Sequence, residues 1–350
     1  MKKKICFIIG ARPQFIKHAP VEIAIKNYFD VFSIHTGQHY DETMSNIFFH
    51  QMKIEKPRYM LSVGSSSHGK QTGQMIEKVE EILIAEKPDA VLVYGDTNST
   101  LAGALAASKL LIPLIHIEAG LRSFNKSTPE EINRIVTDHI SDILVAPTET
   151  AMFNLKNEGI ADKAFRTGDV MYDSILLAKK VIGDNVISNQ HILVTLHRPY
   201  NTDKVERLLL ILSSLNSVGQ KIIFPIHPRT STVLKLNNIS FSDFENISFC
   251  DPVSYFDLIK LQMEASCVIT DSGGIQKEAY LLKKKCITLR SETEWVETLE
   301  NGWNTLVFED LGLLREILLR VPGKYVENIY GEGTGALEIA EILKSHFATR

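Results

Sequence analysis

The feature that most constrains the fold is a series of short, continuously apolar runs that alternate with longer segments of helical periodicity. Strands without polar alternation are buried on both faces, as in a parallel sheet covered by helices. Repetition of strand and helix therefore predicts a doubly wound α/β fold. The predicted strands are Ile5–Ile9, Val31–His35, Ala90–Tyr94, Leu114–Ile117, Ile143–Ala146, Ile192–Leu196, Lys221–Pro225, Ile247–Cys250, Cys267–Thr270 and Cys286–Leu289.

The length and an internal similarity both indicate two domains. A chain of 350 residues exceeds the roughly 250–300 residues at which a single core stops growing. The apolar runs Ile5–Ile9 and Ile192–Leu196 each lead to an Arg-Pro pair before a helix, where proline is tolerated in the first turn. We place the domain boundary near Phe165–Val170, and the last helical segment, Gly335–Phe347, can pack on either domain.

Composition excludes several functional classes. The net charge is −4, without the basic stripe of nucleic-acid-binding proteins. No apolar run approaches the ~18–20 residues of a membrane span, and Ile5–Ile9 is too short for the core of a secretion signal. The cysteines form no Cys-x-x-Cys pair, which is typical of free thiols in a reducing compartment. We expect a cytoplasmic protein that binds neither nucleic acid nor membrane.

Polar and charged residues follow most of the predicted strands. Ligands of open α/β sheets bind outside the carboxyl ends of the strands, so these residues are the first candidates for a site. Several acids, histidines and arginines that converge on one crevice are more than a fold requires. The segments are Arg12, Gly37-Gln38-His39, Gly95-Asp96-Thr97, Glu118–Arg122, His197-Arg198, His227-Pro228-Arg229, Asp271–Gly274 and Arg290–Glu294.

Ser272-Gly273-Gly274 lies between a predicted strand and a helix that opens at Ile275. Small residues let the backbone approach a phosphate, which the free N–H groups and the positive end of the helix then hold. The same pattern also suits a tight strand-to-helix turn. Glu278, one helical turn further on, can reach ribose hydroxyls or face solvent.

Two glycine-rich segments resemble nucleotide-binding motifs only in part. Gly64–Lys70 matches a phosphate loop, but Gln71 stands where the magnesium-binding hydroxyl belongs, which favours a simple Ser/Gly loop. Gly331–Gly335 has no preceding strand, so it is no dinucleotide fingerprint and NAD is not implied.

Some candidate residues also have structural explanations. Thr128 and Glu131 fit a capping box, although a helix start at a cleft can have a second role. His197 and His227 lack a third close ligand, which argues against a structural zinc site. His116 lies within a strand and is expected to be a satisfied core residue.

Nine motifs in order resemble those of the non-hydrolysing UDP-N-acetylglucosamine 2-epimerases, across essentially the whole chain. They are Gly10–Lys17, Thr36–His39, Gly95–Thr97, Glu118–Arg122, Pro129–Arg134, Pro147–Glu149, Gly168–Val170, His197-Arg198 and Asp271–Gln276. The resemblance implies two Rossmann-like domains in the glycosyltransferase type B arrangement, with the active site in a cleft between them, and a homodimer. The domains would be 1–166 and a UDP-binding domain at 167–334, with the helix at 335–350 returning to the first.

The resemblance also implies the reaction. UDP leaves by anti elimination, which gives a 2-acetamidoglucal, and adds back with inverted configuration at C2, without metal or nicotinamide. The implied acid/base residues around the sugar are Asp96, Glu118, Glu131 and His197. The implied substrate contacts are Arg12, Lys17, Arg122, Arg134, His227, Leu258, Ser272, Gly273, Gly274 and Glu278, of which Ser272–Gly274 hold diphosphate, Glu278 ribose, and the segment ending at Leu258 uracil.

Departures from the best-known bacterial members concern the sugar. Gly-Thr-Arg-Pro-Glu is Gly10–Gln14 here, His-Arg-Arg-Glu-Asn is His197–Asn201, and Trp295 replaces an arginine expected near the sugar nucleotide. These changes resemble the branch that includes UDP-2,3-diacetamido-glucuronate 2-epimerases. The additional carboxylate of that substrate would need a cation, for which Arg122, Arg198 and Arg229 are candidates.

Two other functions fit the same scaffold. A UDP-sugar-dependent glycosyltransferase shares the two-domain architecture, which alone does not exclude transfer to an acceptor. A sensor that has lost catalysis would keep the nucleotide loop but not the acid/base set, whereas Asp96, Glu118, Glu131 and His197 are all present here.

Overall fold

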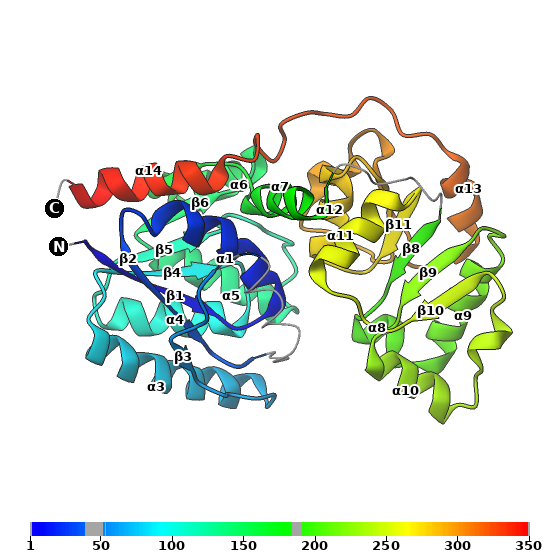
Figure 1. The fold of residues 1–350 in the computed structure, drawn as a ribbon, viewed down its shortest axis with the longest axis horizontal. Helices are drawn as coiled ribbons and strands as arrows, with labels where there is room; N and C mark the ends of the chain where they lie inside the picture. Colours follow the sequence, from blue (N-terminus) through cyan, green and yellow to red (C-terminus); the bar gives the residue numbers. More distant parts are fainter. Residues whose placement is uncertain (1, 39–51, 53, 184–190, 349–350) are drawn as a thin grey trace. The chain divides into compact units, whose positions relative to one another are not determined.

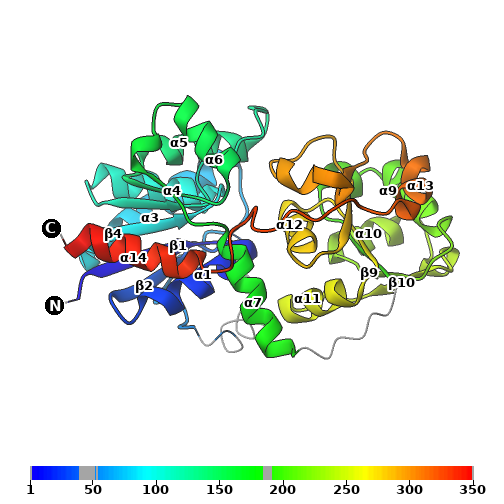
Figure 2. The ribbon, with the colours of Figure 1, turned by 90° about the horizontal axis from the view of Figure 1, so that it is seen from above.

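The computed structural model describes residues 2–38, 52, 54–183 and 191–348. The chain divides into two compact units (Figure 1 and Figure 2). The first consists of Met1–Leu177 together with Asn328–Arg350, and the second of Ala178–Glu327. None of the helices in the described ranges is long and apolar enough to cross a membrane.

The first unit is built on a seven-stranded sheet of parallel strands in the order β3-β2-β1-β4-β5-β6-β7. The direction in which the chain crosses the sheet reverses between β1 and β4. That reversal is a switch point, where the loops diverge and leave room for a ligand. The strands are β1 (Lys4–Ile9), β2 (Asp30–His35), β3 (Tyr59–Met60), β4 (Ala90–Tyr94), β5 (Leu114–Ile117), β6 (Ile143–Ala146) and β7 (Ala164–Arg166).

Helices cover both faces of this sheet. Figure 1 shows α3 and α4 on one face and α1 and α14 on the other, and each pair packs together. Helix α3 turns Met75, Val79 and Leu83 inward at a helical spacing, which anchors it on the sheet. The helices are α1 (Arg12–Ile25), α3 (His68–Glu86), α4 (Asn98–Lys109), α5 (Pro129–Ile140), α6 (Glu149–Asn157), α7 (Val170–Ile182), α14 (Gly335–Ala348) and the 3₁₀ turn η1 (Ala161–Lys163).

The second unit repeats the plan with six parallel strands in the order β10-β9-β8-β11-β12-β13, so that its switch point lies between β8 and β11. Its strands are β8 (Ile192–Thr195), β9 (Ile222–Pro225), β10 (Ile247–Cys250), β11 (Cys267–Thr270), β12 (Lys285–Thr288) and β13 (Asn304–Leu306). Its helices are α8 (Pro199–Thr202), α9 (Val205–Asn216), α10 (Pro228–Leu236), α11 (Tyr255–Glu264), α12 (Gly273–Leu281) and α13 (Leu314–Leu319), with 3₁₀ turns η2 (Phe241–Asp243), η3 (Val296–Gly302) and η4 (Leu311–Leu313).

The predicted fold class is confirmed. Each strand expected from an apolar run is present within one residue at either end. The strands that the sequence missed, β3, β7 and β13, have two or three residues each and lie at sheet edges. Such short edge strands carry too few apolar positions to form a recognisable pattern.

The C-terminal segment docks on the first unit through α7. Asp169 N–H donates to the Tyr330 carbonyl at 2.9 Å, and the Asp173 carboxylate accepts the N–H of Ala336 in the first turn of α14 at 3.1 Å. Asp173 is only 7% exposed. Burial raises its pKa to about 6, with repulsion from Asp169 acting in the same direction and the α14 N–H groups opposing both.

We expect Asp173→Asn to stabilise the protein at neutral pH. Because the folded-state pKa lies above the unfolded value, ionisation favours unfolding, and stability falls as the pH rises from about 4 through 6. The amide keeps the acceptor for Ala336 and removes the buried charge. Urea unfolding should show a gain of about 1–3 kcal/mol near pH 7.5 and almost none near pH 4. A variant no more stable than wild type at neutral pH would contradict this account.

Candidate active site

Lys17 and Glu118 form a buried ion pair at the switch point of the first unit. Lys17 lies on α1 and Glu118 directly follows β5, and their side chains are 10% and 6% exposed. Glu118 has a φ of +71°, a left-handed conformation that is costly for a glutamate. The N–H groups of Glu118 and Ala119, which both donate to the Val145 carbonyl, hold the turn in this conformation.

The turn after β4 lies against this pair. Gly95 has a φ of +61°, and a Cβ added to it would lie 2.9 Å from Glu118 Oε2 and 3.6 Å from Lys17 Nζ. A side chain here would be strained by the backbone conformation and would press on the Glu118–Lys17 pair, and both effects favour glycine at this position. The turn brings Asp96, the next residue, to the same end of the sheet as Glu118.

Helix α5 supplies the partners of Asp96. The Arg134 guanidinium pairs with the Asp96 carboxylate through one nitrogen and with Glu131 through the other, the latter at 3.1 Å. Asn133 donates to the Asp96 carbonyl at 2.9 Å. The Asp96 side chain is 31% exposed, against 1% for Glu131, so Asp96 is the more accessible acid.

The capping box predicted from Thr128 and Glu131 is wrong. The Thr128 side chain makes no capping hydrogen bond. The Glu131 carboxylate accepts instead from the N–H groups of Ser123 and Phe124, at 2.9 and 2.8 Å, and from the Ser123 hydroxyl at 3.0 Å. With Arg134 as a fourth donor, Glu131 fixes the loop that follows Arg122.

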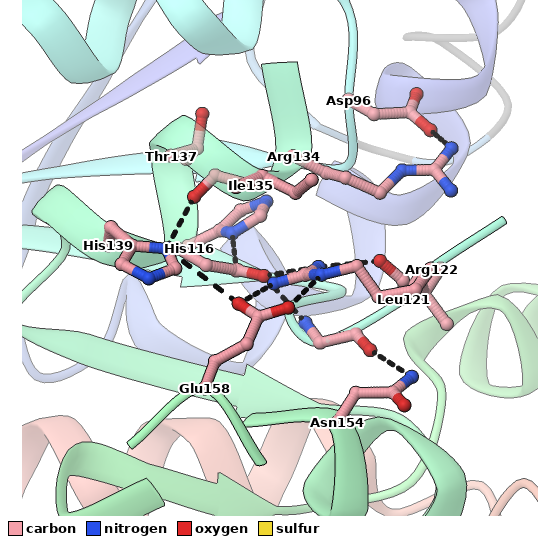
Figure 3. Close-up of polar contacts among 12 residues, drawn as sticks. Asp96, His116, Leu121, Arg122, Arg134, Ile135, Thr137, His139, Asn154 and Glu158 are labelled. Atoms are coloured by element: carbon pink, nitrogen blue, oxygen red, sulfur yellow. Dashed lines mark hydrogen bonds and ion pairs between the residues drawn. The ribbon is translucent and has the colours of Figure 1, made fainter. Parts of the chain in front are cut away.

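Arg122 is the centre of a buried ion-pair network (Figure 3). Its guanidinium pairs with Glu158 through two hydrogen bonds of 2.7 Å and lies 2.7 Å from an Asp138 oxygen. Because the Arg122 side chain is only 1% exposed, its positive charge is removed from water and is balanced by the Asp138 and Glu158 carboxylates. The structure gives Arg122 this internal role within the first unit, and its predicted contact with substrate stays a prediction. Sequence reasoning missed Asp138 and Glu158.

In the second unit, Asp271 organises the turn after β8. Its fully buried carboxylate accepts from the N–H groups of His197 and Arg198, at 3.1 and 3.0 Å, and from the Asn201 amide at 3.2 Å. The His197 Nδ1 lies 3.3 Å from the same carboxylate. Sequence reasoning noticed Asp271 only as part of a motif, although its position after a buried strand was the available signal.

His197 is the titratable group of this turn. Desolvation lowers its pKa below the usual value, and Arg198 and His227 add to that effect while Asp271 opposes it. The ring is therefore neutral at neutral pH and can exchange a proton with a bound molecule. His227 caps α10, where its Nδ1 accepts the Arg229 N–H at 3.2 Å, and the exposed Arg229 pairs with Asp203 at 2.6 Å.

The first turn of α12 forms the candidate phosphate site. Ser272 is the N-cap and accepts the Ile275 N–H at 3.4 Å. A Cβ at Gly274 would have its nearest neighbour, the Ser272 hydroxyl, 4.0 Å away, so the space beside Gly274 is open. The neighbouring Gly273 has no such open space, because the Glu294 side chain lies against it. Glu294 also pairs with Arg290 at 3.0 Å.

The remaining predicted contacts of the second unit lie around α11 and α12. The buried Glu278 accepts from the Gln262 amide at 2.7 Å, and Leu258 on α11 packs partly against the core beneath β11. Trp295 is buried, and the Lys277 ammonium lies 3.7 Å from the centre of its ring. The Arg12 side chain and His39 lie outside the described residues.

The described residues hold no cluster of three or more His, Cys, Asp or Glu side chains suited to a metal ion. Two parallel α/β units, each with charged and polar groups at its switch point, form the architecture in which open α/β proteins bind ligands such as nucleotides. The chain belongs to the UDP-N-acetylglucosamine 2-epimerase family, whose model matches residues 22–344.

Individual relatives match over nearly their full length. A UDP-N-acetylglucosamine 2-epimerase homolog of Methanococcus maripaludis is 50% identical over 98% of this chain and 99% of its own. A UDP-2,3-diacetamido-2,3-dideoxy-D-glucuronate 2-epimerase of Pseudomonas aeruginosa is 46% identical over 97% of this chain and 99% of its own. This chain is also similar to a solved structure, the crystal structure of the Methanocaldococcus jannaschii UDP-GlcNAc 2-epimerase in complex with UDP-GlcNAc and UDP. The two sequences are 42% identical, and the structures superimpose with a TM-score of 0.90 over 98% of this chain and 99% of the other.

Proposed function

We propose that the protein is a non-hydrolysing UDP-N-acetylglucosamine 2-epimerase, an isomerase that interconverts UDP-GlcNAc and UDP-ManNAc. The observation that carries the proposal is the convergence of Glu118, paired with Lys17, and Asp96, paired with Arg134, at one end of the first sheet. Family membership and the relatives named above support the same reaction.

The reaction breaks two bonds and re-forms them. A base takes the proton from C2 while the C1–O bond breaks and its electron pair leaves with UDP. Asp96, Glu118, Glu131 and His197 form the proposed acid/base set, in which Asp96 is half-buried and is the most accessible of the three carboxylates. Elimination and re-addition leave the oxidation state unchanged, so the chemistry needs no nicotinamide, and we propose that it needs no metal.

Charge on the departing diphosphate would be stabilised in two ways. The open N-terminus of α12 at Ser272–Gly274 offers backbone N–H groups and a positive helix end. Arg12 and Lys17 are the proposed cationic contacts of the diphosphate. Other parts of the substrate have their own proposed contacts, which are Glu278 at the ribose, Leu258 near uracil, and Arg134 and His227. Such preorganised groups stabilise a transition state in which negative charge develops on oxygen.

The second candidate substrate is UDP-2,3-diacetamido-2,3-dideoxy-glucuronate, because the Pseudomonas aeruginosa relative carries that name at 46% identity. Its C6 carboxylate would need a cation. Arg122 is enclosed by two carboxylates, whereas the Arg229 side chain is 59% exposed and pairs with Asp203 on the surface. Arg229 is therefore the more accessible of these two candidates.

NMR of the purified protein in D₂O tests the proposal. We expect deuterium to enter C2 of UDP-GlcNAc without any acceptor, with UDP-ManNAc appearing at the same time. The diacetamido uronate, offered in parallel, identifies the preferred sugar by the ratio of the two kcat/KM values. A glycosyltransferase would leave the C2 proton in place, and absence of exchange with both sugars would overturn the proposal.

We further propose a cytoplasmic homodimer. All four cysteines are free thiols, which suits a reducing compartment. Exposed apolar side chains on the first unit support self-association, since Phe165 on the edge strand β7 and Leu337 on α14 line one groove and are 43% and 61% exposed.

A further inference from the structure

His116 has an unusual pair of hydrogen-bond partners for a buried histidine. The ring lies in β5 and is completely buried. Its Nδ1 is 2.7 Å from an Asp138 carboxylate oxygen, and its Nε2 is 2.7 Å from the Gly95 carbonyl oxygen. Figure 3 shows the ring beside the Arg122 network.

The two partners are a backbone carbonyl, which only accepts hydrogen bonds, and a carboxylate, which only accepts them when it is ionised. A backbone carbonyl has no proton to donate, so Nε2 must carry one. The other oxygen of Asp138 accepts the Gly120 N–H at 3.0 Å and pairs with Arg122 at 2.7 Å. The Arg122 guanidinium carries a charge at any physiological pH, and together with the Gly120 N–H it gives this oxygen two donors. This contact requires an ionised Asp138 carboxylate independently of His116, and Nδ1, which faces the carboxylate's other oxygen, must then carry a proton as well.

The charges around the ring balance. The imidazolium of His116 and the guanidinium of Arg122 face the carboxylates of Asp138 on α5 and of Glu158, which follows α6. Beyond Gly95 lies the Lys17–Glu118 pair, which is neutral as a whole. A buried cation is tolerated in such a set because each charge has a hydrogen-bonded counter-charge.

The same ring connects the two turns that carry the proposed acids. Its bond to the Gly95 carbonyl holds the left-handed residue that precedes Asp96. Asp138, its other partner, holds the Gly120 N–H in the turn that begins at Glu118. Displacing Gly95 would also disturb Glu118, because Gly95 lies directly against the Glu118 carboxylate.

We propose that His116 is a positioning residue, held as a buried imidazolium by Asp138, that fixes the turns of Asp96 and Glu118 for catalysis. That the His116 ring is protonated, the structural half, follows from the hydrogen-bond geometry alone. That the ring positions the acids for catalysis, the catalytic half, rests on the proposed epimerase function. Ring protonation and turnover are therefore measured separately.

The protonation state is measured by ¹⁵N NMR of wild-type protein labelled at histidine, with the His116 signals assigned by their loss in His116→Gln or, failing that, through the coupling to Asp138. We expect both ring nitrogens to carry a proton, as two accepting partners require. In Asp138→Asn, where an amide can donate to Nδ1, the ring should carry one proton fewer. A neutral His116 ring in wild type would overturn the inference, whatever the activity.

The catalytic half is tested by measuring both kcat and the Kd for UDP, of which only kcat should change. We expect His116→Gln and Asp138→Asn to lower kcat about 10- to 100-fold, since small displacements of reacting groups have effects of that size. The Kd for UDP, whose proposed contacts include α12 of the second unit, should stay unchanged. His139→Gln is the control for a change at the rim of the network, because His139 lies on the same helix as Asp138, is 45% exposed, and faces Glu158 at 3.7 Å rather than Asp138. Wild-type kcat in His116→Gln would overturn the positioning role.

An inactive wild type would count against the proposed function and not against the imidazolium. If His116→Gln does not fold, the wild-type spectrum and Asp138→Asn still decide the protonation state, and the kcat of Asp138→Asn still tests positioning.

Discussion

Replacing Glu118 by glutamine should lower kcat by about 10²–10⁴-fold, the range that a positioned acid or base contributes. Glutamine has the shape of glutamate but cannot take a proton from C2 or return one. The exchange also leaves the Lys17 ammonium opposite a neutral amide, which should destabilise the protein by about 1–3 kcal/mol. Turnover by NMR, urea unfolding and UDP binding by calorimetry separate these effects.

Lys17→Met keeps the Glu118 carboxylate but removes both the ion pair and the proposed contact of Lys17 with the diphosphate, and the Kd for UDP measures the second of these losses. We expect this variant to retain more activity than Glu118→Gln. Asp96→Asn and Glu131→Gln should also lose most of their turnover. In Glu131→Gln the new amide faces N–H donors from Ser123 and Phe124, so stability should fall as well. Wild-type kcat in Glu118→Gln would remove Glu118 from the acid/base set.

The sheets could be predicted because the buried strands are continuous apolar runs. The central strands β1, β4 and β5 bury essentially every residue on both faces, and that requirement is visible in the sequence. Edge strands such as β13 have neither the length nor the burial to impose such a pattern.

Helix α5 shows why the candidate site was harder to predict. The run Ile132, Ile135 and Val136 reads as the inward face of an amphipathic helix. The structure instead leaves Ile132 49% exposed and turns the polar face inward, with Glu131, Arg134 and Asp138 buried. A helix that serves a charged site reverses the usual rule, since its polar side chains find partners that lie far away in the sequence.

Long-range partners are the part that a single sequence does not contain. Arg122 looked like a spare cation because Glu158 lies 36 residues away and Asp138 had no recognisable motif. His116 was expected to be a satisfied core residue, and both of its ring nitrogens are in fact hydrogen-bonded. The charge that these bonds require depends on the identity of both acceptors, which only the fold brings together.

In the first turn of α12, one substitution is expected to weaken nucleotide binding without lowering the stability of the fold. Ser272 caps the helix, and Gly274 follows in the first turn with open space where a side chain would be. A glycine that had only a structural role would be expected to pack against a neighbour or to have a positive φ. Gly274 has neither property, so the proposed reason for glycine is a close approach of diphosphate to the backbone.

Gly274→Ala should therefore raise the Kd for UDP by about 100-fold or more, or about 3 kcal/mol, without weakening the fold. Apart from its chain neighbours and its own helix backbone, the added methyl group meets no atom of the described residues closer than 4.0 Å. Alanine in a helix also restricts the unfolded chain, so stability should be unchanged or slightly higher. Gly73→Ala on the exposed face of α3 is the matched control, because its Cβ also has no neighbour within 4 Å. It should gain up to about 1 kcal/mol of stability and bind UDP as wild type does. Wild-type affinity for UDP in Gly274→Ala would show that the diphosphate binds elsewhere, and would remove α12 from the proposed mechanism.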